Sequence, residues 1–253
     1  MTFDILIATM KGNFFKKETP IPTNAIIINQ YDKEPYTNTT RKNIYNFQEK
    51  GLSKSRNQAI NISQADICLI SDDDVMYLAD INKTVIDGFT NNPEADIITF
   101  QVQTPESTPF KEYKKEKFWH TKKSIMSVCS IEIAFKRNVI QEKNLKFDEQ
   151  FGLGSTFPTG EENIFLSDAL KKNLNILYIP KPIVVHPMES SGNNYDSIAL
   201  IEAKGAMFYR MFNMLGYMVS IVFTYKKYSS STFSFKTFML LMFGGISKYR
   251  STR

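Results

Sequence analysis

Three consecutive aspartates follow an apolar segment in this 253-residue chain. Residues 66–71 are rich in Ile, Leu and Cys and predict a short buried strand, and Asp72, Asp73 and Asp74 come at its exit. Adjacent carboxylates repel one another, and this repulsion destabilises a fold unless a cation or a hydrogen-bonding shell offsets it. The segment therefore predicts either a solvated acidic turn or a site where a metal ion holds a phosphorylated ligand.

Strand and helix patterns alternate around these aspartates. Apolar runs predict strands at 5–9, 25–29 and 95–102, and periodic segments predict helices at 51–63, with Ser53 as N-cap, and at about 80–90. Strands that alternate with helices predict an α/β fold with a parallel sheet, and ligands of such sheets bind at the carboxyl ends of the strands. The aspartates lie at such an end, which favours the metal site.

The second half of the chain is less regular. A polar, lysine-rich stretch covers about 103–123, and the alternation of residues 127–137 predicts a strand. A glycine-bearing loop at 151–160 precedes a predicted helix at 161–173, and two further strands are predicted at 174–180 and 182–187. We find no internal repeat.

The composition is that of an ordinary globular protein, with 42% apolar and 23% charged residues. Two cysteines, Cys68 and Cys129, are too few for a disulfide framework, so a reducing cytoplasm is expected. The first residues contain Asp4 and no basic leader, and they predict a strand rather than a signal peptide. No apolar run reaches the roughly 18 to 20 residues of a membrane span.

The net charge of +5 is unevenly distributed along the chain. Residues 203–253 contain eight basic side chains and no acidic one, and subtracting these eight from the total leaves the first 202 residues at −3. The basic residues are Lys204, Arg210, Lys226, Lys227, Lys236, Lys248, Arg250 and Arg253. The apolar stretches 216–225 and 233–246 around them are typical of helices in a membrane interface. The alternative is a helical pair packed on the body, and nucleic-acid binding fits the bulky apolar side chains less well.

Two longer motifs resemble a known family. "GLSKSRNQAINISQADICLISDDDV" is similar to the core of family 2 glycosyltransferases with the GT-A fold, in which a helix with an arginine–asparagine pair precedes an apolar strand and an aspartate cluster. "FGLGSTFPTGEENIFLSDALKKN" resembles the acceptor loop and acidic segment of that family. The resemblance extends over about residues 3–210 and is greatest to bacterial transferases for capsular and other surface polysaccharides.

The resemblance implies a Rossmann-like, mostly parallel sheet flanked by helices. Residues 1–202 would form the catalytic domain, with a nucleotide-sugar half at about 1–100 and an acceptor half at about 101–202. Residues 203–253 would form a helical, membrane-associating extension.

The implied reaction is inverting transfer of a sugar from a nucleotide-sugar, for which a UDP-sugar is expected, to a hydroxyl of an acceptor. The donor-binding residues would be Thr9, Asp32, Lys54, Arg56, Asp72 and Asp73. Asp72, Asp74 and His186 would hold Mg²⁺ or Mn²⁺ against the diphosphate. The alternatives are an exposed basic helix face for Lys54 and Arg56, and a structural role for His186.

The acceptor side of the implied site centres on an acidic pair. Glu162 would be the base that takes the acceptor proton, with Glu161 as its substitute. The alternative for Glu162 is structural, because Thr159 and Glu162 also have the spacing of a capping box. Trp119 and Gly160 would contact the acceptor, although a single tryptophan is more often part of the packing, and His120 has less support.

The sequence thus predicts a metal-dependent transferase at the inner face of the cell membrane, acting on a lipid-linked saccharide. A sugar-nucleotide pyrophosphorylase is one rival, but it would need a glycine-rich basic loop after the first strand, where "ATMKGNFFKK" contains a single glycine. A catalytically silent module that binds a saccharide or a membrane is the other. Nucleotide release separates that module from the enzymes.

Overall fold

The computed structural model describes residues 1–12, 21–35, 43–187 and 194–252. The chain forms two compact units. Unit 1 comprises residues 1–50, 54–146 and 166–188, and unit 2 comprises residues 51–53, 147–165 and 189–253. These boundaries differ from the division at residue 203 that the sequence predicts, and that functional division stays a prediction.

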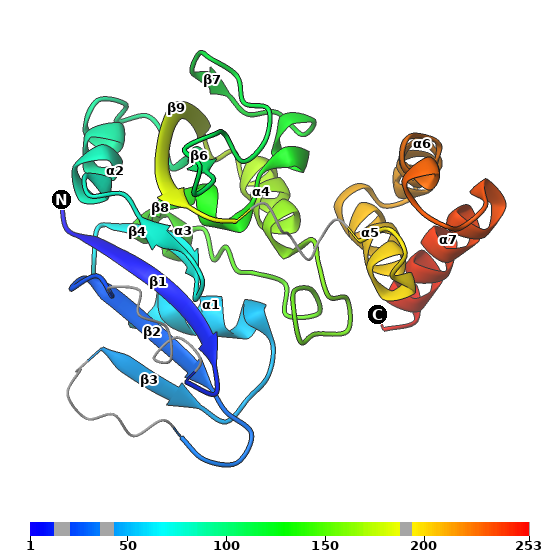
Figure 1. The fold of residues 1–253 in the computed structure, drawn as a ribbon, viewed down its shortest axis with the longest axis horizontal. Helices are drawn as coiled ribbons and strands as arrows, with labels where there is room; N and C mark the ends of the chain where they lie inside the picture. The colour runs from blue at the N-terminus through cyan, green and yellow to red at the C-terminus, as the bar shows by residue number, and fades with distance from the viewer. Residues whose placement is uncertain (13–20, 36–42, 188–193, 253) are drawn as a thin grey trace. The chain divides into compact units, whose positions relative to one another are not determined.

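Unit 1 is built on one mixed, mostly parallel sheet with the strand order β3-β2-β1-β4-β8-β6-β9-β5, and β7 pairs with β9 outside this path (Figure 1). The strands are β1 (Phe3–Met10), β2 (Ala25–Gln30), β3 (Ile44–Phe47), β4 (Ile67–Asp72), β5 (Met76–Tyr77), β6 (Ile97–Gln103), β7 (Phe118–Trp119), β8 (Ile133–Lys136) and β9 (Ile176–Val185). Strands β3, β2, β1 and β4 are parallel, as are β6 and β9, whereas β8 runs antiparallel to β4 and β6. The predicted α/β fold is confirmed.

The core of unit 1 follows the apolar patterns of its strands. All residues of β2 are buried, and β4 is buried up to Ser71, so Asp72 is the first residue of that strand to reach solvent. Helix α2 (Ile81–Thr90) buries Ile81, Val85 and Phe89, four residues apart, against the sheet. Each such side chain contributes about 1.5–3 kcal/mol by its removal from water. Helices α1 (Leu52–Ile62) and α3 (Arg137–Glu142) complete the flanking layers.

Three local predictions are wrong. Residues 127–132 form no strand: the 3₁₀ helices η2 (Ser124–Ser127) and η3 (Ser130–Glu132) precede the short β8, because the Glu132 carboxylate accepts a hydrogen bond from the Cys129 backbone N–H at 3.1 Å and closes a turn. The two strands predicted after residue 173 are the single strand β9, whose register with β6 shifts around Gln101. Ser53 lies inside α1 and is not its N-cap.

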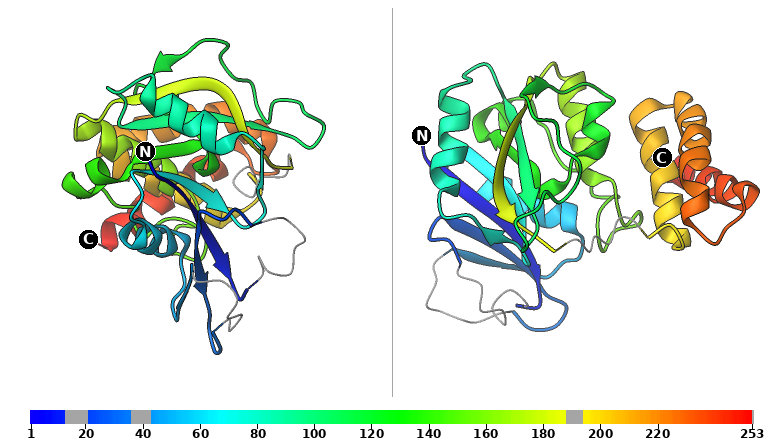
Figure 2. Two further views of the ribbon diagram at one scale, coloured as in Figure 1. Left: turned by 90° about the vertical axis from the view of Figure 1, so that its left-hand side faces the viewer. Right: turned by 45° about the horizontal axis from the view of Figure 1, so that its top comes forward.

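Unit 2 contains the C-terminal helices α5 (Ile198–Phe212), α6 (Leu215–Lys227) and α7 (Phe235–Ser251), which pack against one another, as the right view of Figure 2 shows. The short helix η5 (Tyr228–Ser230) connects α6 to α7. The two apolar stretches predicted at 216–225 and 233–246 lie in α6 and α7, and α5 precedes this helical pair. Among the described residues, none of the helices has the length and apolar character required to cross a bilayer.

Helices α5 and α7 pack with their backbones in close contact. A Cβ atom at Gly205 would collide with the Met242 carbonyl, and one at Gly245 with the Glu202 carbonyl. Only glycine allows this approach, so the two positions fix the α5–α7 contact.

Candidate functional site

Unit 1 brings most of the predicted donor-side residues to one edge of its sheet. Strand β1 lies between β2 and β4 and is parallel to both, so the three strands end together. Thr9 lies opposite Asn29, and Ala8 lies opposite Asp72. The carboxyl edge of this sheet therefore carries the three aspartates, as an α/β sheet carries its ligands.

Asp72 is paired with the buried Arg56. The Arg56 Nη2 atom donates to Asp72 Oδ1 at 2.9 Å, and the arginine side chain is 1% exposed whereas the aspartate is 36% exposed. Ser130, at the start of η3, places its hydroxyl 3.5 Å from the other carboxylate oxygen. The exposed basic face considered for Arg56 is therefore wrong, because α1 directs this side chain inward, and the arginine holds Asp72 in one orientation.

Asp73 is held from β1. The Thr9 hydroxyl, which is buried, donates to Asp73 Oδ2 at 2.6 Å. A threonine at the end of one strand thus orients a carboxylate at the end of the next.

Asp74 faces His186 across a short pair of strands. Strand β5 pairs with the end of β9, with Met76 opposite Val185, and this ladder brings together residues that are far apart in the sequence. The distance from His186 Nε2 to Asp74 Oδ1 is 3.4 Å. That contact, above all, raises the pKa of His186.

The second ring nitrogen of His186 fixes how the ring can act. Nδ1 lies 2.7 Å from the Pro187 carbonyl oxygen, and a carbonyl can only accept, so Nδ1 carries a proton. In the neutral ring Nε2 then has a free lone pair on the side of Asp74. Metal-ligating histidines are commonly oriented by a backbone carbonyl in this way.

The end of β2 carries a second polar group. Lys11 Nζ lies 2.7 Å from Asp32 Oδ2, and this hydrogen bond lowers the pKa of Asp32 although both side chains are exposed. Beneath it, the buried Asn29 accepts from the Gly12 N–H and donates to Asn46, both at 2.8 Å. The sequence analysis missed Asn29, whose only signal is an amide side chain at the end of an apolar strand.

Unit 2 carries the predicted acidic pair at the start of α4 (Glu161–Lys171). Glu161 is buried, whereas Glu162 is partly exposed. Glu161 packs against Gly152, where an added Cβ atom would lie 3.3 Å from the Glu161 carboxyl carbon. Helix α4 begins at Glu161, so Gly160 directly precedes it. Gly160 has φ +94°, and a Cβ atom there would lie 2.6 Å from Met207 Sδ. The loop before α4 therefore requires glycine, and Glu162 is the more accessible carboxylate.

One predicted residue of unit 1, Trp119, lies away from the aspartates. Trp119 pairs with Leu177 at the beginning of β9, whereas His186 follows the end of that strand, so the tryptophan is at the opposite edge of the sheet. Lys54 is half-buried on α1. The structure brings together Thr9, Arg56, the aspartates and His186, but not Trp119.

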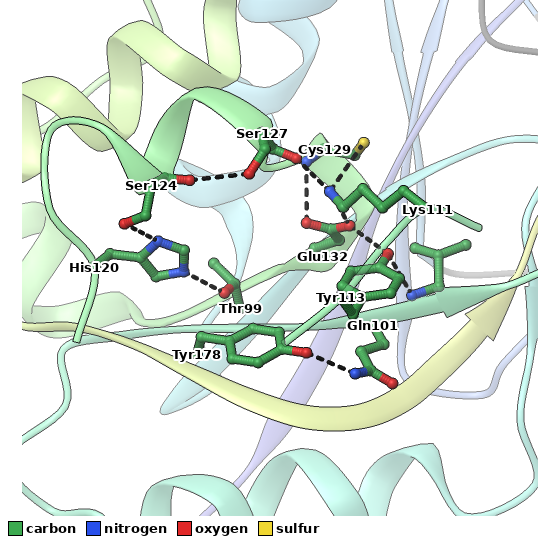
Figure 3. Close-up of polar contacts among 11 residues, drawn as sticks. Thr99, Gln101, Lys111, Tyr113, His120, Ser124, Ser127, Cys129, Glu132 and Tyr178 are labelled. Atoms are coloured by element: carbon green, nitrogen blue, oxygen red, sulfur yellow. Dashed lines mark hydrogen bonds and ion pairs between the residues drawn. The ribbon is translucent and has the colours of Figure 1, made fainter. Parts of the chain in front are cut away.

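A buried network beside this edge was missed by sequence reasoning (Figure 3). The Glu132 carboxylate accepts from the Tyr113 hydroxyl at 2.6 Å and pairs with Lys111 Nζ at 2.6 Å. Burial raises the pKa of Glu132. Tyr113 also accepts from the Val102 N–H at 3.0 Å, so the network ties the polar segment after β6 to η3, the element that carries Ser130.

His120 belongs to the same region and is structural. Its Nε2 atom lies 2.8 Å from the Thr99 hydroxyl and its Nδ1 atom 3.0 Å from the Ser124 hydroxyl (Figure 3). Burial, with a smaller effect of the positive charge of Lys111, lowers the pKa of His120 to about 4. The ring is therefore neutral at physiological pH.

Comparison with known proteins bears on the fold. No protein-family model matches the chain, and no curated protein matches it. The solved structure of TarS residues 1–349 from S. aureus is similar, with a TM-score of 0.56 and 12% identity over 90% of this chain and 72% of that one. TarS 1–349 in complex with UDP-GlcNAc has a TM-score of 0.57 and 14% identity over 91% and 74% of the two chains. A longer TarS structure has a TM-score of 0.58 and 14% identity, and the match covers 92% of this chain and 44% of that one.

At this level of identity the likeness concerns the fold alone. TarS is a GT-A-like glycosyltransferase, and this chain has a GT-A-like glycosyltransferase fold. The narrower assignment to family 2 stays a prediction.

Proposed function

We propose that this protein is a glycosyltransferase that moves a sugar from a nucleotide-sugar, specifically a UDP-sugar, to a hydroxyl of a saccharide acceptor. The observation that carries the proposal is the meeting of three consecutive carboxylates with Thr9, Arg56 and His186 at the carboxyl edge of the sheet. The fold supports it, because the similar protein TarS has been solved with UDP and with UDP-GlcNAc.

A divalent cation, Mg²⁺ or Mn²⁺, belongs to this proposal, with Asp74 and His186 as its protein ligands and Asp72 beside them. Among the residues that the structure describes, no group of three or more His, Cys, Asp or Glu side chains could hold a metal. Two protein donors nevertheless fit such an ion, because Mg²⁺ commonly binds through one or two carboxylates plus substrate phosphates and water. Bound there, the cation would neutralise the charge that develops on the leaving diphosphate.

The chain's own residues would orient the donor and move the proton. Arg56 and Thr9 hold Asp72 and Asp73 in fixed orientations, so the edge is arranged before a substrate arrives. Asp32 and Lys54 are proposed to contact the nucleotide. Glu162 is proposed to take the proton of the attacking hydroxyl onto its carboxylate, which direct displacement with inversion requires. Glu161 is its substitute, and Gly160 and Trp119 are proposed acceptor contacts.

The acceptor and the place of action extend the proposal. The excess of basic side chains in residues 203–253 favours an anionic partner. We propose that the acceptor is a lipid-linked saccharide for bacterial surface polysaccharide and that the enzyme works at the inner face of the cell membrane.

The test is UDP release from a panel of UDP-sugars with Mn²⁺ and saccharide acceptors. We expect the wild type to transfer the sugar of one UDP-sugar to the acceptor and to release UDP, and Asp74→Asn to do neither. Asp87→Asn, a matched change on α2, should retain activity. UTP formed from a UDP-sugar and pyrophosphate would indicate the pyrophosphorylase instead. Binding of a UDP-sugar without release under any condition would indicate a silent module and overturn the proposal.

A further inference from the structure

Helix α6 exposes a row of large apolar side chains and fully buries only small or polar ones, which is unusual for a helix in water. Its buried positions are the small or polar residues Gly216, Ser220 and Thr224. Phe223 and Tyr217 also turn inward, where their rings contact Phe208 and Tyr209 of α5. Most of the other large apolar side chains of α6 point outward. The exposed ones are Met214 at the N-cap, Leu215, Met218, Ile221, Val222 and Tyr225, each at least 36% exposed and Tyr225 75% exposed. We call these six residues the α6 stripe.

The α6 stripe is one continuous face. At about 100° per residue, its six positions fall within an arc of about 120°, and the three buried positions lie on the opposite side. A helix of a globular protein normally turns such an arc toward the core. A contiguous exposed apolar face of this kind marks an interaction surface.

The inward face of α6 has the composition of helix contacts in membranes. Gly216, Ser220 and Thr224 recur every fourth residue, and a Cβ atom on Gly216 would lie 2.6 Å from Tyr209 Cα, so α6 meets α5 through its backbone. The Ser220 hydroxyl is satisfied locally, since it donates to the Gly216 carbonyl at 2.8 Å. Small residues at the closest helix contacts, with an apolar face turned outward, are the arrangement that lipid-facing helices adopt.

The charges of the C-terminal segment, residues 203–252, indicate which apolar partner the stripe meets. Residues 203–252 contain no acidic side chain, and Lys226 and Lys227 directly follow Tyr225, with Lys226 exposed at the edge of the arc. Lys227 lies over the ring of Tyr195, with Nζ 5.4 Å from the ring centroid. An apolar helix face with cations at its end fits a bilayer surface that contains anionic headgroups.

The size of the face argues for lipid rather than a second copy of the chain. A stable interface buries about 800 Å² on each partner with about 20–30 residues, and the stripe has far fewer. With 13 residues, α6 is about 20 Å long, too short for the hydrocarbon core of about 30 Å, so it would lie in the plane of the membrane.

From these observations we infer that the α6 stripe is a membrane-docking surface that inserts into the interface of an anionic bilayer. The inference rests on the membrane location in the proposed function and names the face that makes the contact. It would hold the acceptor-using enzyme at the surface where a lipid-linked substrate is found.

The test is flotation of the full chain with vesicles of phosphatidylcholine alone and of phosphatidylcholine with phosphatidylglycerol. We expect binding to the anionic vesicles, and the double variant Met218→Glu/Val222→Glu should weaken it by at least about tenfold, since two side chains would leave the apolar phase. The matched variant Met218→Leu/Val222→Leu should bind as the wild type does. Lys226→Gln should weaken binding to anionic vesicles by about fivefold and binding to neutral ones little.

Several outcomes would overturn the inference. Wild-type binding by the glutamate variant, or no binding by the wild type, would remove the stripe from any membrane role. A wild-type oligomer that dissociates in the glutamate variant would assign the face to a second copy. UDP release with a soluble acceptor is measured on the same variants. Vesicle binding without UDP release would contradict only the proposed function. UDP release without vesicle binding would contradict only this inference. Unchanged circular dichroism shows that the variants fold.

Discussion

The two hydroxyl partners of His120 allow a quantitative prediction about stability. The ring is buried between Thr99 and Ser124, and its pKa is lowered to about 4 from an ordinary value of 6.5, first by burial and then by the nearby charge of Lys111. Replacing His120 with Gln removes the titration while keeping a side chain that can donate to one hydroxyl and accept from the other.

The sign follows from where the proton binds. Between pH 6.5 and about pH 4 the unfolded chain binds a proton at His120 and the folded chain does not, so unfolding is favoured as the pH falls. The stability contribution is fully present above pH 6.5 and is lost as the pH falls through about 4. At about 1.4 kcal/mol per pH unit, the wild type should lose about 2 kcal/mol of unfolding free energy from this group between about pH 7 and about pH 5.

Urea unfolding followed by tryptophan fluorescence measures this loss. The chain has one tryptophan, Trp119, and it lies in unit 1 beside His120, so the signal reports the unit in question. Carboxylates also titrate in this range, but they contribute equally to the wild type and to His120→Gln. The difference between the two proteins should therefore shrink by about 2 kcal/mol as the pH is lowered from about 7 to about 5.

A constant difference between the two proteins across this range would refute the reasoning. It would mean that His120 takes up its proton as readily in the folded chain as in the unfolded one, and hence that the ring is hydrated. The hydrogen bonds to Thr99 and Ser124 would then not define a closed neutral site.

Three further predictions concern the candidate site and its supporting loop. Asp74→Asn should weaken Mn²⁺-dependent binding of UDP by at least about tenfold in calorimetry, and equal affinity in the wild type and the variant, with or without chelator, would contradict the metal role. Glu162→Gln should lower turnover by about 10²-fold or more with donor affinity little changed, and near-normal turnover would mean that another group is the base. Gly160→Ala should lower the free energy of unfolding by about 1–3 kcal/mol because φ is +94° and the Met207 side chain fills the space, and an unchanged thermal midpoint would contradict that geometry.

Local sequence determined most of the regular structure. The apolar runs of β1, β2 and β4 and the periodic pattern of α2 predicted these elements because burying an apolar run or stripe decides where a strand or helix forms. The position of the aspartates at a strand exit was equally local, since it depends only on where the apolar run stops. The motif resemblance predicted the GT-A-like fold that the structure and its likeness to TarS support.

The contacts within the candidate site depend on strand order, which a single sequence does not specify. His186 meets Asp74 only because β5 pairs with the end of β9, and Thr9 reaches Asp73 only because β1 lies beside β4. At η3 the sequence predicts a strand because its apolar residues alternate. The Glu132 side chain instead closes a turn there, and this buried carboxylate also pairs with groups from a segment predicted to be polar and irregular.

Helix α6 shows the same limit most clearly. Its sequence predicts a helix with an apolar face, for which the sequence left open both a membrane interface and packing on the body. The tertiary structure turns it outward, because the small side chains of Gly216 and Ser220 allow α6 to approach its neighbours closely, whereas the bulky side chains of the stripe do not. Periodicity determines that a helix has two faces, and the fit between backbones decides which of them is buried.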